Sequence, residues 1–429
     1  MIKSITVLGS SSGKNAGDAA LLAGLMEAID TACGRKILYE IPTYRPYYIW
    51  NNYQTRVRPV SMQPFWGSVG MFGAPTAASL LRSSMTLVFD APLFDRKIWN
   101  PLTNYLPPIW LAAKTCKSLG KKFGLYNVGA GPVTTDFGRR LLADTAKMAD
   151  FITIRDSDSY NLLAELGASE EKMLITADAA IPVSASPKEN VDQILKELGL
   201  FEEGEILAIN INGYINSWAG ADQAPISRDQ FTTTYGAALS EALEELGHPQ
   251  LLFVCTQHND ISITEELMGK TKTKGKKRLF SNIHYNHHDT KGVFGRVSFL
   301  FAMRLHASIL ATSMLTPASA LIFQIKVSSY YDLLGLKDKT LSFKDFSKET
   351  VRQTITQGWR DRQKTKEILK QKIPFLATEA LKAAEIVAAA DRGECPLALI
   401  KNFKTKKKET NHYLTNGKAK TETEHKPTD

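Results

Sequence analysis

The sequence predicts an α/β protein built from two Rossmann-like domains that face each other across a cleft. Its 429 residues are too many for one ordinary hydrophobic core. Short β-branched and apolar runs alternate with helical segments twice, first in residues 1–185 and again in residues 195–345. Between the halves lies PVSASPKENV (Pro182 to Val191), whose proline and serine content is typical of a linker. Residues 346–400 are expected to form helices that pack back on the first domain.

The composition is that of a soluble globular protein, with 43% hydrophobic and 23% charged residues. The N-terminal MIKSITVLGS lacks the zones of a signal peptide, and Arg82 interrupts the best apolar run. We therefore expect a cytoplasmic protein. The four cysteines lie far apart, without a CxxC pair or clustered histidines, which predicts reduced thiols and neither a disulfide framework nor a zinc site.

The chain opens with a strand at residues 5–8 and a small-residue loop, GSSSGKNAG (Gly9 to Gly17), before a helix expected from Asp18 to about Ala32. Strand, glycine loop and helix are typical of a doubly wound domain. The glycines have neither the Walker nor the GxGxxG spacing, which excludes a P-loop NTPase. A second strand is expected at residues 36–41.

An aromatic segment follows, from Tyr44 to Trp66, with several tyrosines and tryptophans among three arginines. Aromatic faces and guanidinium groups suit a sugar ring or an anionic glycan, which makes Tyr48 and Trp50 candidate acceptor contacts. A long loop packed by its own aromatic side chains explains the pattern equally well.

The other strands of the first half end in polar residues. The expected elements are strands at residues 85–91, 123–128, 151–154 and 173–176 and helices at residues 107–119, 136–148 and 160–166. Asp90 and Asp95 follow the first of these strands, Arg155 follows the third, and Asp178 follows the last. Because open parallel sheets bind ligands at the carboxyl ends of their strands, Arg155 is expected to point into the cleft.

The second half repeats this alternation. Its expected elements are strands at residues 206–211, 251–255 and 298–303 and helices at residues 227–246, from Val327 and from Lys348, the last continuing with breaks past Pro374 to about Ala390. The second of these strands is followed by TQHND, which contains His258 and Asp260.

One stretch of the second half, Ser298 to Lys326, predicts an anion site. A buried strand delivers Arg304 and His306 to the start of a helix, and Lys326 follows the next apolar run. The free N–H groups of a helix N-terminus attract anions, and a histidine there adds a group that titrates near neutrality. A structural arginine cap and a structural histidine are the alternative interpretations.

Positive charge is concentrated near the C-terminus. The net charge is +9, and residues 401–429 hold eight lysines against four acidic residues, so +4 belongs to this tail. We expect a disordered, solubilising tail, with peripheral contact to an anionic membrane or to nucleic acid as the less favoured readings. A second basic run, Lys270 to Arg278, is interpreted as a solvated loop rather than a polyanion site, and no nucleic-acid partner is predicted.

Several stretches together resemble the polysaccharide pyruvyl transferase family over roughly residues 1–340. They are NAGDAAL (Asn15 to Leu21), GAGPV (Gly129 to Val133), IRDSDSYNLLAELGA (Ile154 to Ala168), TADAA (Thr176 to Ala180), HND (His258 to Asp260) and MRLHASILATSMLTPASAL with the later lysine (Met303 to Lys326). Two departures concern acceptor recognition: FDAPLFDR (Phe89 to Arg96) replaces a glycine-rich loop, and Ala179 replaces a proline.

The resemblance implies a GT-B-like fold and transfer of the pyruvyl group of phosphoenolpyruvate onto a sugar as a cyclic ketal. Arg155, Arg304 and Lys326 match the family's phosphoenolpyruvate-binding positions, and His306 is the expected general acid. Asp18 or Asp260 would act as the base. Tentative acceptor contacts are Asn15, Gly17, Tyr48, Trp50, His258 and Asp260. No metal or cofactor is expected.

Two rival functions remain at this stage. A GT-B glycosyltransferase or epimerase would use a nucleotide sugar, but no carboxylate suited to its ribose lies near Leu315 to Gln324. A catalytically inactive glycan-binding protein would keep the aromatic segment and need no cation cluster. The acceptor itself could be a lipid-linked repeat unit at the inner membrane face, a cell-wall glycan precursor or a soluble sugar.

Overall fold

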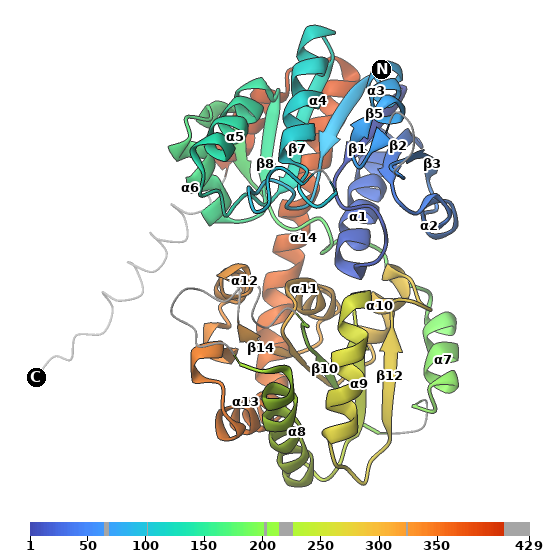
Figure 1. Cartoon of the computed structure of the whole chain (residues 1–429), viewed down its shortest axis with the longest axis vertical. Coiled ribbons are helices and arrows are strands. Elements are labelled where there is room, and N and C mark those ends of the chain that lie inside the picture. The colour runs from blue at the N-terminus through green and yellow to red at the C-terminus, as the bar shows by residue number, and fades with distance from the viewer. Residues whose placement is uncertain (64–67, 101, 201–203, 214–225, 323–324, 407–429) are drawn as a thin grey trace, which may run out of the picture.

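The computed structural model describes residues 1–63, 68–100, 102–200, 204–213, 226–322 and 325–406. Two lobes lie one above the other, and one long helix, α14 (Arg362–Arg392), runs through both (Figure 1). No helix within these ranges is long and apolar enough to cross a membrane.

The first lobe contains a parallel sheet in the order β3-β2-β1-β6-β7-β8-β9. Its strands are β1 (Ser4–Leu8), β2 (Leu38–Thr43), β3 (Arg56–Ser61), β6 (Met85–Val88), β7 (Lys122–Val128), β8 (Phe151–Ile154) and β9 (Met173–Ile175). Its helices are α1 (Ala16–Cys33), α2 (Pro46–Asn52), α3 (Ala74–Arg82), α4 (Leu106–Ser118), α5 (Asp136–Met148) and α6 (Ser157–Glu165). A short antiparallel pair joins β4 (Ser68–Val69) to β5 (Phe72–Gly73). The central strands β1, β6 and β8 are wholly buried, as parallel strands covered on both faces must be.

The second lobe contains a parallel sheet in the order β12-β11-β10-β13-β14-β15. Its strands are β10 (Ile206–Asn210), β11 (Gln250–Cys255), β12 (Lys277–Ser281), β13 (Phe299–Ala302), β14 (Ala318–Ile322) and β15 (Thr340–Ser342). Its helices are α7 (Lys188–Glu197), α8 (Arg228–Glu245), α9 (Ile261–Lys270), α10 (His287–Phe294), α11 (Leu305–Ser313), α12 (Ile325–Leu334) and α13 (Lys348–Arg360). Two parallel α/β domains confirm the predicted fold class.

The aromatic segment is more regular than a packed loop. It forms α2 and then β3, the edge strand of the first sheet, while Phe65 and Trp66 lie outside the described residues. Likewise the basic run at residues 270–278 is only partly a loop. Its last two residues begin β12, because they pair with β11 at the sheet edge.

The helix expected from Lys348 past Pro374 to about Ala390 is found as α13 and α14, with one break at Asp361, and α14 continues past Pro374 to Arg392. One prediction at the C-terminus was wrong. The tail expected from residue 401 is helical through residue 406, where Phe403 packs against the core and Lys404 donates a hydrogen bond to the Glu170 carbonyl (2.6 Å). Residues 407–429 of that tail lie outside the described residues.

Helix α14 ties the C-terminal region to the first sheet. Asp391 accepts hydrogen bonds from the Ile2 amide and from the Arg35 guanidinium (2.8 Å). Farther along, the Asn127 side-chain amide donates to the Ala380 carbonyl (3.1 Å). Both lobes are therefore joined through one helix as well as through the linker.

The start of α1 also joins the two lobes. Asn15 caps this helix, which begins two residues before the expected Asp18, and forms an isolated β-bridge with Gln257. The Ala16 amide donates to the Thr256 carbonyl (2.8 Å). These backbone contacts bring the N-terminus of α1 to the carboxyl end of β11, where the cleft lies.

We expect Asp391→Ala to destabilise the protein, because it removes the acceptor shared by the Ile2 amide and the Arg35 guanidinium. The loss should be about 1–3 kcal/mol in urea unfolding. Glu394→Ala, which removes an exposed partner of Arg392, is the control and should change stability by less than about 0.5 kcal/mol. Equal effects of the two substitutions would contradict the role given to this contact.

Candidate functional site

A cavity of about 140 Å³ lies between the lobes, at the carboxyl ends of both sheets. It is lined by Asn15, Arg155, Asn212, Thr256, Arg304, Leu305, His306 and Lys326. The structure thus brings together Asn15 and the four residues expected to carry the chemistry. Three of them are cations, and no carboxylate appears among the described lining residues.

Arg155 directly follows β8 and is buried at the base of the cleft. Its Nη1 atom donates to Asp178 Oδ2 at 3.0 Å. Burial alone would raise the pKa of Asp178, but the Arg155 guanidinium and His306 outweigh it and hold this pKa at about 2. Asp178 is therefore a permanent anion behind Arg155.

His306 lies in the first turn of α11, in the second lobe. Its Nε2 atom is 3.5 Å from Asp178 Oδ2, so one carboxylate of the first lobe faces both Arg155 and His306. The ring also packs against α1, since a Cβ atom at Gly17 would lie 2.3 Å from it. Gly17, expected as an acceptor contact, is therefore needed for the close approach of α1 to His306.

Arg304 lies between β13 and α11 and is paired with Asp260. The fully buried Asp260 carboxylate accepts from both Nε and Nη2 of Arg304, the latter at 2.7 Å, and also from the Gly213 amide at 2.9 Å. A bidentate pair of this kind fixes the plane of the guanidinium. Asp260 was a candidate base, but its oxygens are engaged in orienting Arg304.

Asp18, in the first turn of α1, is electrostatically coupled to this cluster. Burial and the neighbouring Asp90 raise its pKa well above the ordinary value, and Arg155 and Arg304 oppose the rise only in part. A raised pKa makes the ionised carboxylate a stronger proton acceptor than an ordinary aspartate, which suits a general base.

Lys326 lies in the first turn of α12 and its Nζ atom is 3.5 Å from the Gly131 carbonyl oxygen. Burial and the charge of Arg155 lower its pKa to about 8. An anion bound in the cavity would favour the protonated form. The charge of Lys326 therefore changes near pH 8, whereas Arg155 and Arg304 stay charged at that pH.

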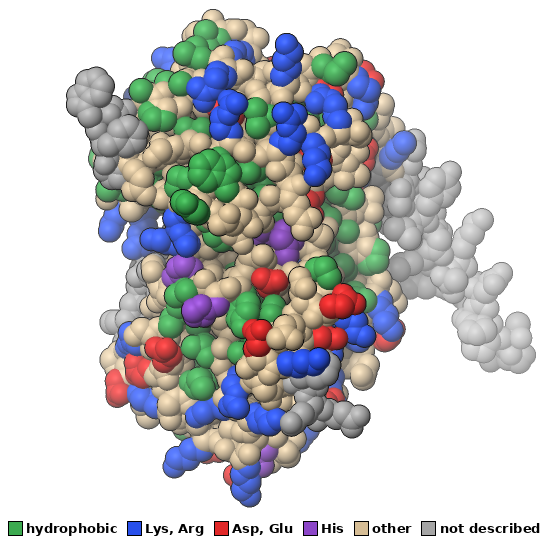
Figure 2. Space-filling model, turned by 90° about the vertical axis from the view of Figure 1, so that its right-hand side faces the viewer, with side chains coloured by type: hydrophobic (Ala, Val, Ile, Leu, Met, Phe, Trp, Pro, Cys, Tyr) green, Lys and Arg blue, Asp and Glu red, His purple; other side chains and the backbone are tan. Residues whose placement is uncertain are grey.

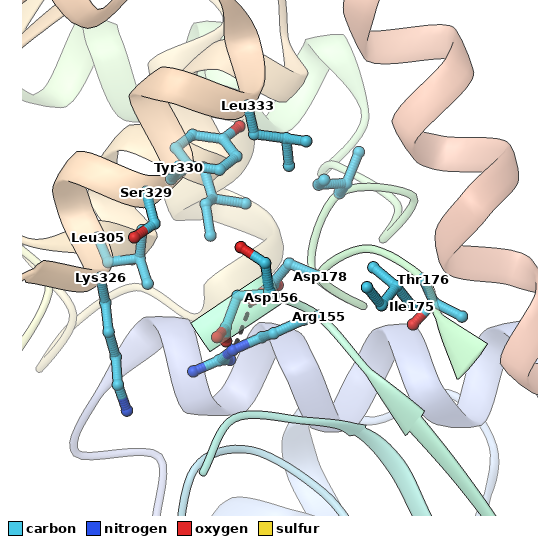
Figure 3. A pocket seen from close by; sticks show the side chains of 13 residues that line it. Arg155, Asp156, Ile175, Thr176, Asp178, Leu305, Lys326, Ser329, Tyr330 and Leu333 are labelled. Atoms are coloured by element: carbon cyan, nitrogen blue, oxygen red, sulfur yellow. Dashed lines mark hydrogen bonds and ion pairs between the residues drawn. The ribbon is translucent and has the colours of Figure 1, made fainter. Parts of the chain in front are cut away.

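A second chamber of about 140 Å³ adjoins the first and shares Arg155, Leu305 and Lys326 with it. Figure 3 shows the ion pair of Arg155 and Asp178 facing α12, which carries Lys326, Tyr330 and Leu333. Its wall combines charged side chains, among them Asp156 and Asp178, with an apolar surface to which Tyr330 and Leu333 contribute.

The other predicted acceptor residues do not line the cavity. His258 lies in a short 3₁₀ helix, η2 (His258–Asp260), where its backbone amide donates to the Lys14 carbonyl (3.1 Å). Tyr48 packs over Gly13 and its hydroxyl lies 3.3 Å from His287 Nδ1. Trp50 is exposed on α2, edge-on to Tyr47.

Sequence reasoning gave no role to Asp178 and Asp90, which shape the electrostatics of the site. Asp90 lies two residues after β6 and Asp178 three residues after β9, and this position near the carboxyl end of a strand was visible in the sequence. In the described ranges, no group of three or more histidine, cysteine, aspartate or glutamate side chains is arranged to hold a metal ion.

A family model described as polysaccharide pyruvyl transferase matches residues 15–322 of the chain. No match is found among curated proteins. This range contains Asn15, Asp18, Arg155, Asp178, Arg304 and His306, and it ends before Lys326.

Solved structures share the fold at low sequence identity. A putative UDP-N-acetylglucosamine 2-epimerase from Listeria monocytogenes is 13% identical, with a TM-score of 0.57, and the match covers 91% of this chain and 96% of that one. The UDP-N-acetylglucosamine 2-epimerase of Neisseria meningitidis, bound to UDP-N-acetylglucosamine, is 11% identical with a TM-score of 0.56 and covers 88% and 97%. Anabaena HepE, in complex with UDP and glucose, is 11% identical with a TM-score of 0.52 and covers 95% and 100%. These likenesses support the GT-B-like fold.

Anion binding should weaken as Lys326 loses its proton. With sulfate as the probe, which stays doubly charged, we expect affinity to fall by up to about tenfold per pH unit above about pH 8. Lys326→Arg should lack this fall, because a guanidinium does not titrate there. Asp18 titrates in both proteins, so the difference between their calorimetric profiles isolates Lys326, and identical profiles would contradict its assignment.

Proposed function

The chain belongs to the polysaccharide pyruvyl transferase family, and on this premise we propose that it transfers the pyruvyl group of phosphoenolpyruvate to two hydroxyls of one sugar, forming a cyclic ketal. The observation that carries the proposal is the convergence of Arg155, Arg304 and Lys326 on one cavity beside His306. Phosphoenolpyruvate carries a carboxylate and a phosphate. A small cavity with three cations matches such a compact polyanion better than a neutral sugar.

The proposed reaction begins with protonation of the donor's methylene carbon. His306 supplies this proton, which makes the adjacent carbon electrophilic, and one sugar hydroxyl attacks it and gives its proton to a base. The bond between this carbon and the phosphate oxygen then breaks and phosphate leaves. The second hydroxyl closes the ketal and gives its proton to the departing phosphate, while the proton taken up by the base returns to His306. The balance is one phosphoenolpyruvate and one diol converted to one ketal and one phosphate.

Asp18 is the base in this proposal. Its raised pKa favours proton uptake by the carboxylate, whereas Asp260 is held by Arg304 and the Gly213 amide. Asp178 acts as a positioning residue, since it contacts both Arg155 and His306. In this proposal Arg155, Arg304 and Lys326 hold the carboxylate and the phosphate of the donor, and no metal or cofactor is invoked.

The acceptor is a sugar of a cell-surface polysaccharide or of its precursor. We place the reaction in the cytoplasm, where lipid-linked precursors are exposed at the inner membrane face. The decisive assay measures phosphate release from phosphoenolpyruvate with saccharide acceptors, and mass spectrometry should detect the pyruvylated product. Turnover of a UDP-sugar without any use of phosphoenolpyruvate would overturn the proposal.

His306→Ala should lower turnover by about two to four orders of magnitude, the usual contribution of a positioned acid. The affinity for phosphoenolpyruvate in isothermal titration should change little, because the three cations remain. An active His306→Ala enzyme would remove the histidine from the mechanism.

The two candidate bases should give different kinetic results. Asp18→Asn should lower kcat and remove the limb of the pH–rate profile that rises as the carboxyl group loses its proton. Asp260→Asn should instead raise the KM for phosphoenolpyruvate, because Arg304 loses its charged bidentate partner. If Asp260→Asn abolished the rising limb and Asp18→Asn kept it, the assignment would be reversed.

A further inference from the structure

A groove rich in amide side chains runs along the boundary between the lobes. It consists of two adjoining cavities of about 250 and 390 Å³, which share Asn51, Asn52 and Asn286. We call it the amide groove and define it by Asn51, Asn52, Gln54, Asn190, Asn282 and Asn286. Figure 2 views the side of the molecule on which α2 and α7 lie, with histidine side chains at its waist.

The groove offers hydrogen bonds that the protein itself does not use. The side chains of Asn51, Gln54 and Asn190 are exposed and make no hydrogen bond to another described residue. Asn282 is buried, and its Oδ1 atom accepts no hydrogen bond in the described part of the chain. The side chains of Asn52 and Asn286 are engaged within the protein. An amide both donates and accepts, as a sugar hydroxyl does, so the remaining amides suit a ligand rich in hydroxyls.

Aromatic surface and charge agree with a neutral sugar as the ligand. Tyr47 lines the groove and is 77% exposed, which provides a flat apolar face for the C–H edges of a sugar ring. The charged lining residues, Arg45 and Asp289, are of opposite sign, and the lining also contains His284 and His288. A balanced lining does not favour a polyanion such as nucleic acid.

The groove begins next to the catalytic cavity. The Asn282 side-chain amide donates to the Lys14 carbonyl (3.1 Å), and the next residue, Asn15, lines that cavity. Tyr48, which lines the groove, packs so closely on Gly13 that a Cβ atom there would lie 2.3 Å from the ring. Three residues of backbone, Gly13 to Asn15, therefore lie between the amide groove and the catalytic cavity.

We propose that the amide groove binds the sugar residues next to the one that is pyruvylated, so that its side chains increase the affinity for the acceptor as the glycan lengthens. The combined size of the two cavities falls within the range of ligand pockets. This inference rests on the proposed function, because it takes the neighbouring cavity as the place of sugar transfer.

The test uses an array of bacterial polysaccharide fragments, from monosaccharides to hexasaccharides, probed with the full chain and without any donor. Wild type should bind the longer fragments better than the monosaccharides. Asn51→Ala and Asn190→Ala should each weaken binding of the longer fragments by about threefold to tenfold, the loss expected for one hydrogen bond. Asn161→Ala, an exposed asparagine on α6 outside the groove, is the matched control and should bind as wild type does.

Two results would overturn the inference: wild-type binding that does not increase with fragment length, including no binding at all, or equal binding by the groove variants and the control. The donor proposal is tested separately, by titration with phosphoenolpyruvate and by phosphate release. If binding increases with fragment length but phosphoenolpyruvate is not used, the proposal for the groove is retained and the proposal for the donor is rejected. If kcat/KM is equal for a monosaccharide and its oligomers, the proposal for the groove is rejected and the proposal for the donor is retained.

Discussion

The site depends on one buried carboxylate, that of Asp178. This carboxylate lies just after β9 in the first lobe. It accepts a hydrogen bond from Arg155 and faces His306 of the second lobe. A buried charge is costly unless it is paired, and Arg155 provides the pairing that keeps Asp178 ionised. The position of His306 relative to Arg155 therefore depends on how the two lobes meet.

Close backbone contacts between the two lobes make this arrangement possible. Gly17 lets α1 approach the His306 ring, and the Ala16 amide binds the Thr256 carbonyl across the cleft. Nearby, the buried Lys291 donates to the carbonyls of Ile181 and Val183, both at 2.7 Å, and so ties α10 to the linker between the lobes. The lobes are thus held together on both sides of the catalytic cavity.

Two kinds of chemistry lie side by side at this boundary. The catalytic cavity is small and cationic, whereas the amide groove is larger, polar and nearly neutral. This division suits a transferase whose donor is a compact polyanion and whose acceptor is a hydroxyl-rich chain. The proposed donor would occupy the first kind of site, and the proposed acceptor chain would occupy the second.

The sequence by itself determined the two parallel α/β domains, the family, and the polar residues that follow the strands. These features were predictable because alternating short apolar runs and helices specify parallel sheets, and parallel strands bring their carboxyl ends to one edge. Arg155, Arg304 and His306 could therefore be placed near one cleft from local patterns alone.

Only the tertiary structure decided how those residues pair. Whether Asp260 serves as a base or orients Arg304, and whether Gly17 touches substrate or makes room for His306, depends on contacts between segments far apart in the chain. The amide groove arises in the same way, since its asparagines come from α2, α7 and the loop after β12. Local sequence patterns carry no information about such long-range contacts, because these contacts follow from the relative orientation of the two lobes.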